Sequence, residues 1–254
     1  MSRENRFGGI WTEKKLMALK DYLSAYMRIF SKNEPASWFQ TTYLDAFAGT
    51  PYRSAPETPE INSDSALFDL YSDQDVQDYK KGSALIALET DPPFDKYLFV
   101  EQKQESVKQL GILKDQVKGK IQVVHGEANE KIREWCRETD WQKNRAVVFL
   151  DPYGMQVEWQ TIIAIAETKG IDLWLLFPLG QAVLRLLMRK QPPEGAWAER
   201  LTKFFGTEDW REAFYSPVMQ LSLSFDDTVE EEQFERNVGW EKVEAFFLAC
   251  DPGF

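Results

Sequence analysis

The first part of this chain carries a helical pattern of hydrophobic positions. Between residues 12 and 30, apolar side chains recur at spacings of three and four, which predicts an amphipathic helix with Thr12 as its N-cap. The buried stripe of this helix is expected to contain Leu16, Leu19, Leu23, Tyr26, Met27 and Phe30.

From residue 37 to residue 177 the pattern changes to short apolar runs that alternate with helical segments. The predicted strands are 37–48, 97–101, 121–124, 146–150 and 172–177, and the predicted helices between them are 82–89, 106–113, 128–138 and 157–169. Because the strand runs are continuously apolar, they indicate a parallel sheet that is buried on both faces. The right-handed crossover rule then favours a doubly wound, Rossmann-like α/β fold.

Two regions depart from this alternation. Residues 52–81 are rich in proline, serine and acidic residues, which predicts an acidic insertion after the first strand with a short helix over 66–71. Beyond the core at 1–180, we expect a mainly helical region at 181–254. Its predicted elements are helices at 180–190, 194–205 and 208–215, an edge strand at 219–225, an acidic loop at 226–235 and a final helix at 238–249.

Composition narrows the classes of protein that fit. The 254 residues are 43% apolar and carry a net charge of −11, which is typical of a globular protein without a general attraction for nucleic acid or anionic membranes. Two cysteines and one histidine are too few for a Cys/His zinc site. The chain opens without an apolar leader, and polar residues interrupt its most apolar stretch, 171–187, so we expect a cytoplasmic protein with no metal and no membrane span.

Candidate chemistry lies where the predicted strands end, since ligands of open parallel sheets bind beyond the carboxyl ends of the strands. The first strand ends in Asp45, Phe47 and Gly49, and the next helix opens at Gly82 after the insertion. Glu101 ends the second strand 19 residues after Gly82, which is the spacing of the acid that binds ribose hydroxyls in Rossmann units. The alternative is a turn glycine and a solvated glutamate.

The third strand is followed by another carboxylate. Glu127 could accept a hydrogen bond from the amino group of an adenine. Alternatively, Asn129 caps the next helix and Glu127 favours its positive N-terminal end. We expect His125 to be structural.

The fourth strand ends in the run Asp151-Pro152-Tyr153. An aspartate at this edge could take a hydrogen bond or a proton from an amine, and Tyr153 offers a ring for stacking. The alternative is a tight turn, because Pro-Tyr-Gly is common in turns.

Several of these segments together resemble the three-Cys-motif partner proteins. The resemblance is carried by 45–50 (DAFAGT), 82–89 (GSALIALE), 93–101 (PFDKYLFVE), 126–130 (GEANE), 149–159 (FLDPYGMQVEW) and 172–180 (DLWLLFPLG). It implies a class I methyltransferase-like fold that binds S-adenosylmethionine, and a three-Cys-motif companion protein similar to iron–sulfur radical enzymes. The chain departs from the family pattern at Pro51, where a second loop glycine is usual, and at Glu127, where aspartate is usual. Relatives are expected to continue into more strands, so either the region 181–254 is shortened or the sheet is closed differently.

Three functional hypotheses follow. The first is an S-adenosylmethionine-dependent methyltransferase in which Asp45, Phe47, Gly49 and Gly82 shape the methionine side of the pocket. Glu101 then binds ribose, Glu127 lies near adenine, and Asp151, Pro152 and Tyr153 position the acceptor.

The run Asp151-Pro152-Tyr153 resembles the Asp/Asn-Pro-Pro-Tyr motif of enzymes that methylate amino groups of nucleobases, although the net charge does not favour nucleic acid.

The second hypothesis is a non-catalytic adaptor that binds the companion through the acidic segments 57–78 and 226–235. The third, a nicotinamide dehydrogenase, is disfavoured because no G-x-G-x-x-G joins a strand to a helix.

Overall fold

The computed structural model describes residues 9–49, 82–115, 120–178, 182–188, 191–221, 230–236 and 239–250. The predicted insertion 52–81, including its helix at 66–71, lies outside these residues. Contacts divide the chain into two units. The first comprises Met1–Asp151 and Thr168–Leu175, and the second Pro152–Glu167 and Leu176–Phe254.

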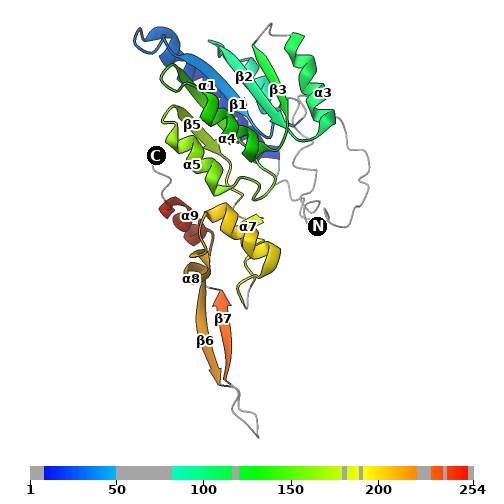
Figure 1. The fold of residues 1–254 in the computed structure, drawn as a ribbon, viewed down its shortest axis with the longest axis vertical. Helices are drawn as coiled ribbons and strands as arrows, with labels where there is room; N and C mark the ends of the chain where they lie inside the picture. Colours follow the sequence, from blue (N-terminus) through cyan, green and yellow to red (C-terminus); the bar gives the residue numbers. More distant parts are fainter. Residues whose placement is uncertain are drawn as a thin grey trace, which may run out of the picture. The chain divides into compact units, whose positions relative to one another are not determined.

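The first unit is built on a five-stranded parallel sheet (Figure 1). Its strands are β1 (Gln40–Asp45), β2 (Lys96–Glu101), β3 (Ile121–His125), β4 (Asn144–Leu150) and β5 (Ile171–Leu175). Their spatial order is β3-β2-β1-β4-β5. The α/β, doubly wound Rossmann-like architecture expected from the sequence is therefore confirmed. The chain builds outward from β1 to β3 and then returns to place β4 on the other side of β1, so the strand order reverses between β1 and β4.

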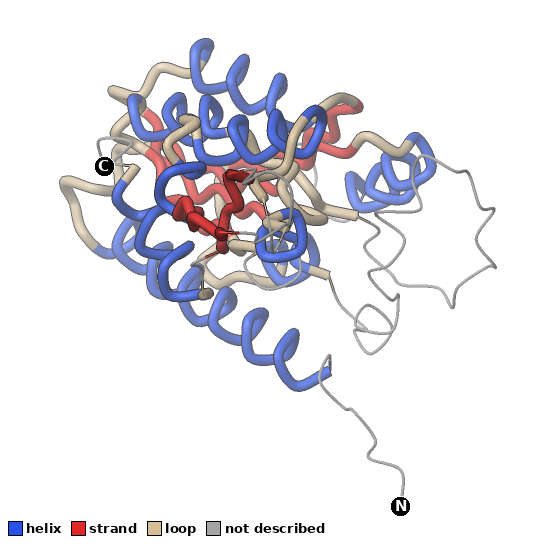
Figure 2. Tube along the Cα trace, turned by 90° about the horizontal axis from the view of Figure 1, so that it is seen from below, coloured by secondary structure: helices blue, strands red, loops and turns tan. Residues whose placement is uncertain are grey.

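The helices of this unit are α1 (Gly9–Lys32), α2 (Ser83–Leu88), α3 (Gln104–Ile112) and α4 (Ala128–Glu138). Figure 2 shows α1 as one uninterrupted helix at the N-terminal end of the described chain. It begins at Gly9, so the expectation that Thr12 caps it is wrong: Thr12 lies inside the helix. The stripe expected from the sequence is confirmed by the burial of Leu16, Leu19 and Leu23.

The two faces of the sheet pack against different helices. Tyr43 of β1 contacts Phe94, and Phe94 in turn contacts Tyr26 of α1, with ring centroids 5.9 and 6.0 Å apart. Side chains alternate along a strand, so Asp45 shares the α1 face with Tyr43. Helix α4 covers the opposite face, next to Thr42 and its neighbours (Figure 1).

The burial of the strands explains why their continuous apolar runs could be recognised in the sequence. In β1, β2 and β4 nearly every position is buried, whereas β3 and β5 at the sheet edges are only half-buried. The central strands therefore need apolar residues on both faces.

At the other end of the sheet, hydrogen bonds join β1 to the residue before β2. The carboxylate of Asp95 accepts the amide and the hydroxyl of Thr41 at 2.8 and 2.9 Å.

The second unit contains α5 (Trp159–Glu167), α6 (Leu184–Leu186), α7 (Gly195–Phe205), α8 (Trp210–Phe214) and α9 (Trp240–Ala249). It also contains β6 (Tyr215–Leu221) and β7 (Glu230–Arg236), which pair antiparallel in a sheet of their own. Its core is aromatic. Phe247 of α9 lies 4.3 Å from Phe177 and 5.1 Å from Trp159 between ring centroids.

One expectation for this unit is wrong, and another is confirmed only in part. The acidic loop predicted at 226–235 is a strand from Glu230 onward, because pairing with β6 overrides the low strand preference of glutamate. The helix predicted at 180–190 is present but shorter among its described residues, with a π-helical turn at 182–183 followed by the α-helical Leu184–Leu186. The carbonyls of Leu184 and Leu187 accept hydrogen bonds from the Arg236 guanidinium instead of continuing a helix.

Candidate functional site

The carboxyl ends of β1 and β4 flank the point where the strand order reverses. In open α/β sheets this is where a crevice for ligands forms. Asp45 is the last residue of β1, and Asp151 directly follows β4. With Glu101 at the end of β2, three carboxylates predicted from the sequence lie along the same edge and face of the sheet. We call this edge the rim, defined by Asp45, Gly49, Glu101 and Asp151.

Asp45 is a fully buried carboxylate. Its Oδ1 accepts the Phe47 amide at 3.1 Å, and its Oδ2 accepts the Ser83 hydroxyl at 2.5 Å. Burial raises the pKa of Asp45 to about 7, an effect to which the negative charges of Asp151 and Glu101 add and which the two hydrogen bonds oppose. Near neutral pH, this group therefore changes charge within the rim.

Gly49 and Glu101 close the loop after β1. The Glu101 carboxylate accepts the Gly49 amide at 3.1 Å on one oxygen and the Lys103 amide at 2.9 Å on the other. Gly49 has a positive φ of 60°, and no atom of the described residues lies within 4 Å of the position that a Cβ would take. The glycine thus bends the chain and leaves the backbone open on that side.

The remaining predicted residues of the methionine side lie next to Asp45. Phe47 is half-buried, and its amide is held by the Asp45 carboxylate. Gly82 is the N-cap of α2 and precedes Ser83, whose hydroxyl donates to Asp45. Hydrogen bonds therefore join Asp45 to Phe47 and to Ser83, which follows Gly82, and separately join Glu101 to Gly49.

Glu127 lies at the N-terminal end of α4, as the alternative interpretation expected. It is itself the N-cap of α4, and its two carboxylate oxygens accept the amides of Asn129 and Glu130 at 3.0 and 2.8 Å. The interpretation that Asn129 caps this helix is wrong, since Asn129 lies in its first turn. Glu127 is exposed beyond β3, so capping leaves part of its carboxylate open to solvent. His125 is exposed, with Nε2 2.8 Å from the Gln102 carbonyl oxygen.

Asp151 has a partner that the sequence analysis did not assign to the site. The Lys15 ammonium donates to Asp151 Oδ2 at 2.5 Å, across 136 residues of sequence. The side chain of Lys15 is 20% exposed and that of Asp151 is 38% exposed. One signal was available: Lys15 lies four positions before Leu19, at the flank of the buried stripe of α1.

Pro152 and Tyr153 belong to the second unit. Pro152 is buried, whereas Tyr153 is 57% exposed, and its amide donates to the side chain of Gln156 at 3.0 Å. The predicted trio at the end of β4 is therefore divided: Asp151 lies at the rim of the first unit, and the next two residues begin the second.

A second residue that sequence reasoning missed is Tyr43. Its side chain is fully buried on the α1 face, and its hydroxyl has no hydrogen-bond partner among the residues that the structure describes. Burial raises the pKa of Tyr43, and the negative charges of Asp45 and Asp151 raise it further. An unsatisfied buried hydroxyl costs roughly 1–3 kcal/mol, so a polar ligand or a water molecule near it would be stabilising.

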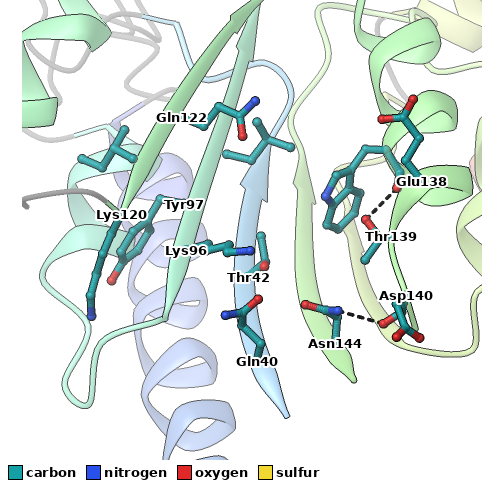
Figure 3. Close-up of a pocket in the computed structure, with 13 residues that line it drawn as sticks. Gln40, Thr42, Lys96, Tyr97, Lys120, Gln122, Glu138, Thr139, Asp140 and Asn144 are labelled. Atoms are coloured by element: carbon teal, nitrogen blue, oxygen red, sulfur yellow. Dashed lines mark hydrogen bonds between the residues drawn. The ribbon is translucent and has the colours of Figure 1, made fainter. Parts of the chain in front are cut away.

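A separate groove of about 420 Å³ lies at the opposite end of the sheet (Figure 3). In Figure 3, Gln40, Thr42 and Lys96 from the strands lie opposite Glu138 and Thr139 at the end of α4. Its lining comes from the amino ends of the strands and from the α4–β4 connection. Because the acids of the strand ends lie at the other edge, this groove is distinct from the rim.

The described ranges contain neither a metal cluster nor a membrane span. No group of three or more histidine, cysteine or acidic side chains there could hold a metal ion. No helix in those ranges is both long and apolar enough to cross a bilayer. Cys136 and Cys250 are free thiols, and burial raises the pKa of Cys136 to about 12.

Among solved structures, the chain is similar to the crystal structure of protein LPL1258 from Legionella pneumophila, which carries the family-model label DUF519. The two align over 98% of this chain and 95% of that one, with 15% identity and a TM-score of 0.44. Neither a family model nor a curated protein matches the chain.

Proposed function

We propose that this chain binds S-adenosylmethionine at the rim and is a methyltransferase that uses it. The observation that carries the proposal is the bond between Glu101 and Gly49 beside the reversal of strand order. It joins an acid at the end of β2 to a glycine with positive φ just after β1, and this combination is suited to a nucleoside.

The ribose side of the proposal rests on Glu101. Each oxygen of this carboxylate accepts one backbone amide. A carboxylate has about four acceptor positions, so the bonds within the described ranges leave about two for ribose hydroxyls. The two amides also fix the orientation of the carboxylate before a ligand arrives.

The methionine side rests on Asp45 and its neighbours. A buried carboxylate with a pKa of about 7 favours a cationic ligand, because an adjacent positive charge stabilises its ionised form. Phe47, Gly49 and Gly82 would line this side. The hydroxyl of Tyr43, which has no partner among the described residues and senses the charges of Asp45 and Asp151, offers a further polar contact.

The assignment of Glu127 to adenine is part of the proposal. The carboxylate accepts three hydrogen bonds from its own helix terminus, two of them from the backbone. These bonds hold it in a fixed orientation beyond β3. An exocyclic amine would have to share it with the helix amides.

For the acceptor, we propose an amino group positioned by Asp151, Pro152 and Tyr153. S-adenosylmethionine supplies a methyl group for in-line displacement, so alignment of the amine provides much of the acceleration. Asp151 already holds one ammonium group, that of Lys15, and this ion pair engages its Oδ2 atom. A nucleobase amine fits this chemistry, and the family resemblance adds a three-Cys-motif companion protein.

Titration calorimetry tests the proposal. We expect wild-type protein to bind S-adenosylmethionine and not NAD. Glu101→Ala should weaken binding about 10–100-fold, since hydrogen bonds to charged groups contribute roughly 1.5–3 kcal/mol. Glu105→Ala, which removes an exposed glutamate from α3, is the matched control and should bind like wild type. Equal affinities for the wild type and the Glu101 variant would refute the pocket assignment.

A second candidate is a non-catalytic adaptor that binds the companion. It is favoured by the acidic β7 strand, which pairs with β6 in a separate ribbon instead of joining the parallel sheet. Of the acidic segments invoked for this role, 57–78 lies outside the described residues. Methyl-transfer assays on nucleic acid, protein and small-molecule pools separate the two candidates, because an adaptor transfers no methyl group to any of them.

A further inference from the structure

We infer that Lys15 of α1 binds the carboxylate of the ligand's amino-acid end, and this inference rests on the proposed function. The N-terminal helix would then belong to the binding site and not only to the scaffold. The observation behind it is the ion pair that brings the Lys15 ammonium to Asp151 at the rim.

The position of Lys15 is fixed by packing. Leu16 and Leu19, its neighbours along the helix, are 6% and 0% exposed. They anchor this turn of α1 on the sheet, and the Lys15 side chain is itself only 20% exposed. The aliphatic stem is therefore largely covered, while the ammonium is held at the carboxyl end of β4.

The carboxylates of the rim make a positive side chain necessary if the ligand itself carries a carboxylate. Asp45, Glu101 and Asp151 all place carboxylates there, and the charges of Glu101 and Asp151 are both felt at Asp45. S-adenosylmethionine carries a sulfonium, an ammonium and a carboxylate. Its two positive groups suit the rim, but its carboxylate would be repelled unless a positive side chain met it.

Lys15 can meet this carboxylate without leaving Asp151. An ammonium has three N–H donors, and the bond to Asp151 uses one of them. The other two donors can serve a ligand carboxylate, while the negative charge of Asp45 favours the ligand's ammonium. Asp151 then acts as a positioning residue for Lys15, and its Oδ1 atom can still accept from an amine.

The alternative is that Lys15 only neutralises Asp151. A partly exposed ion pair of this kind contributes little to stability, and the two interpretations differ in one measurable property. Only a carboxylate contact makes Lys15 distinguish ligands that have the carboxylate from ligands that lack it.

The experiment compares S-adenosylmethionine with decarboxylated S-adenosylmethionine by calorimetry. Wild-type protein should prefer the carboxylated ligand about 10–100-fold, as expected for a charge-assisted hydrogen bond. In Lys15→Gln this preference should fall to about twofold or less, mainly through weaker binding of S-adenosylmethionine. Lys15→Arg should retain most of the preference. Lys20→Gln, which changes an exposed lysine of the same helix, should leave it intact.

Both ligands are measured on the same variant, so a general loss of folding lowers the two affinities together and does not change their ratio. Only the loss of a contact with the carboxylate changes the ratio. An unchanged ratio in Lys15→Gln would overturn the inference. A wild-type protein that binds both ligands without preference would overturn the inference alone. A wild-type protein that binds neither ligand would overturn the proposed function as well.

Discussion

At the residue scale, Asp45 is a carboxyl in an environment very different from water. It lies at the end of an apolar strand with no exposed surface, and it keeps its hydrogen bonds to Phe47 and Ser83. Its raised pKa means that ionisation inside the protein is costly. A buried group retained at this cost is typical of a functional position.

This cost leads to a prediction about stability and pH. Between about pH 4 and pH 7 the folded protein holds a proton on Asp45 that the unfolded chain releases, so this group lowers the free energy of unfolding as pH rises through that range. The loss amounts to up to about 4 kcal/mol. Asp45→Asn cannot ionise and can keep bonds to both partners, so it should match wild type only below about pH 4, and its advantage in stability should grow from pH 5 to pH 8.

Urea unfolding at the two pH values measures this difference. Asp21→Asn, at an exposed position of α1, is the control and should follow the wild-type pH dependence. If the Asp45→Asn protein showed the same change between pH 5 and pH 8 as wild type, the assigned burial of Asp45 would be wrong.

Some residues of the candidate site could be predicted from the sequence and others could not, for a physical reason. Asp45, Gly49, Glu101 and Asp151 lie at or just beyond strand ends, and strand ends are visible in the local pattern. Lys15 was missed because its role depends on Asp151, a partner 136 residues away. Tyr43 looks like any core aromatic until its hydroxyl is found without a partner among the described residues.

At the element scale, the predicted helices and strands agree with the structure where local pattern and packing favour the same conformation. The helix predicted at 194–205 is α7 (Gly195–Phe205), with its apolar face buried at Ala198, Leu201, Phe204 and Phe205. Local pattern failed where a neighbouring element supplied the hydrogen bonds. The glutamates of β7 and the carbonyls next to α6 are the two cases, and both depend on contacts with β6 or Arg236.

The end of α7 gives a prediction at this scale. Gly206 closes the helix with φ of 76°, and its amide donates to the Thr202 carbonyl at 2.8 Å. An added Cβ would lie 2.1 Å from Cδ1 of Trp159. Gly206→Ala should therefore lose roughly 2–5 kcal/mol of stability through the combined cost of the left-handed backbone and the clash.

Gly195→Ala separates these two costs. Gly195 also has a positive φ, of 57°, but no atom of the described residues lies within 4 Å of its added Cβ. This variant should lose only about 1–2 kcal/mol. The measurement is urea unfolding followed by tryptophan fluorescence. Equal losses for the two alanine variants would show that the Trp159 contact carries no cost.

At the scale of the whole molecule, the sequence was sufficient to predict the parallel sheet but not its strand order. Buried apolar strands alternating with helices restricted the fold to doubly wound arrangements. The order β3-β2-β1-β4-β5 then places the reversal between Asp45 and Asp151. The two-stranded ribbon of β6 and β7 was not predicted, since half of it carries the composition of a loop.

The central claim is that a nucleoside-bearing methyl donor binds at the carboxyl ends of β1, β2 and β4. A crystal structure of the protein soaked with S-adenosylhomocysteine, the demethylated product, tests it most directly. The claim predicts the ribose hydroxyls on the Glu101 carboxylate and the amino-acid end beside Asp45 and Lys15. Density for the ligand in the groove between Gln40 and Thr139, or no bound ligand at saturating concentration, would contradict it.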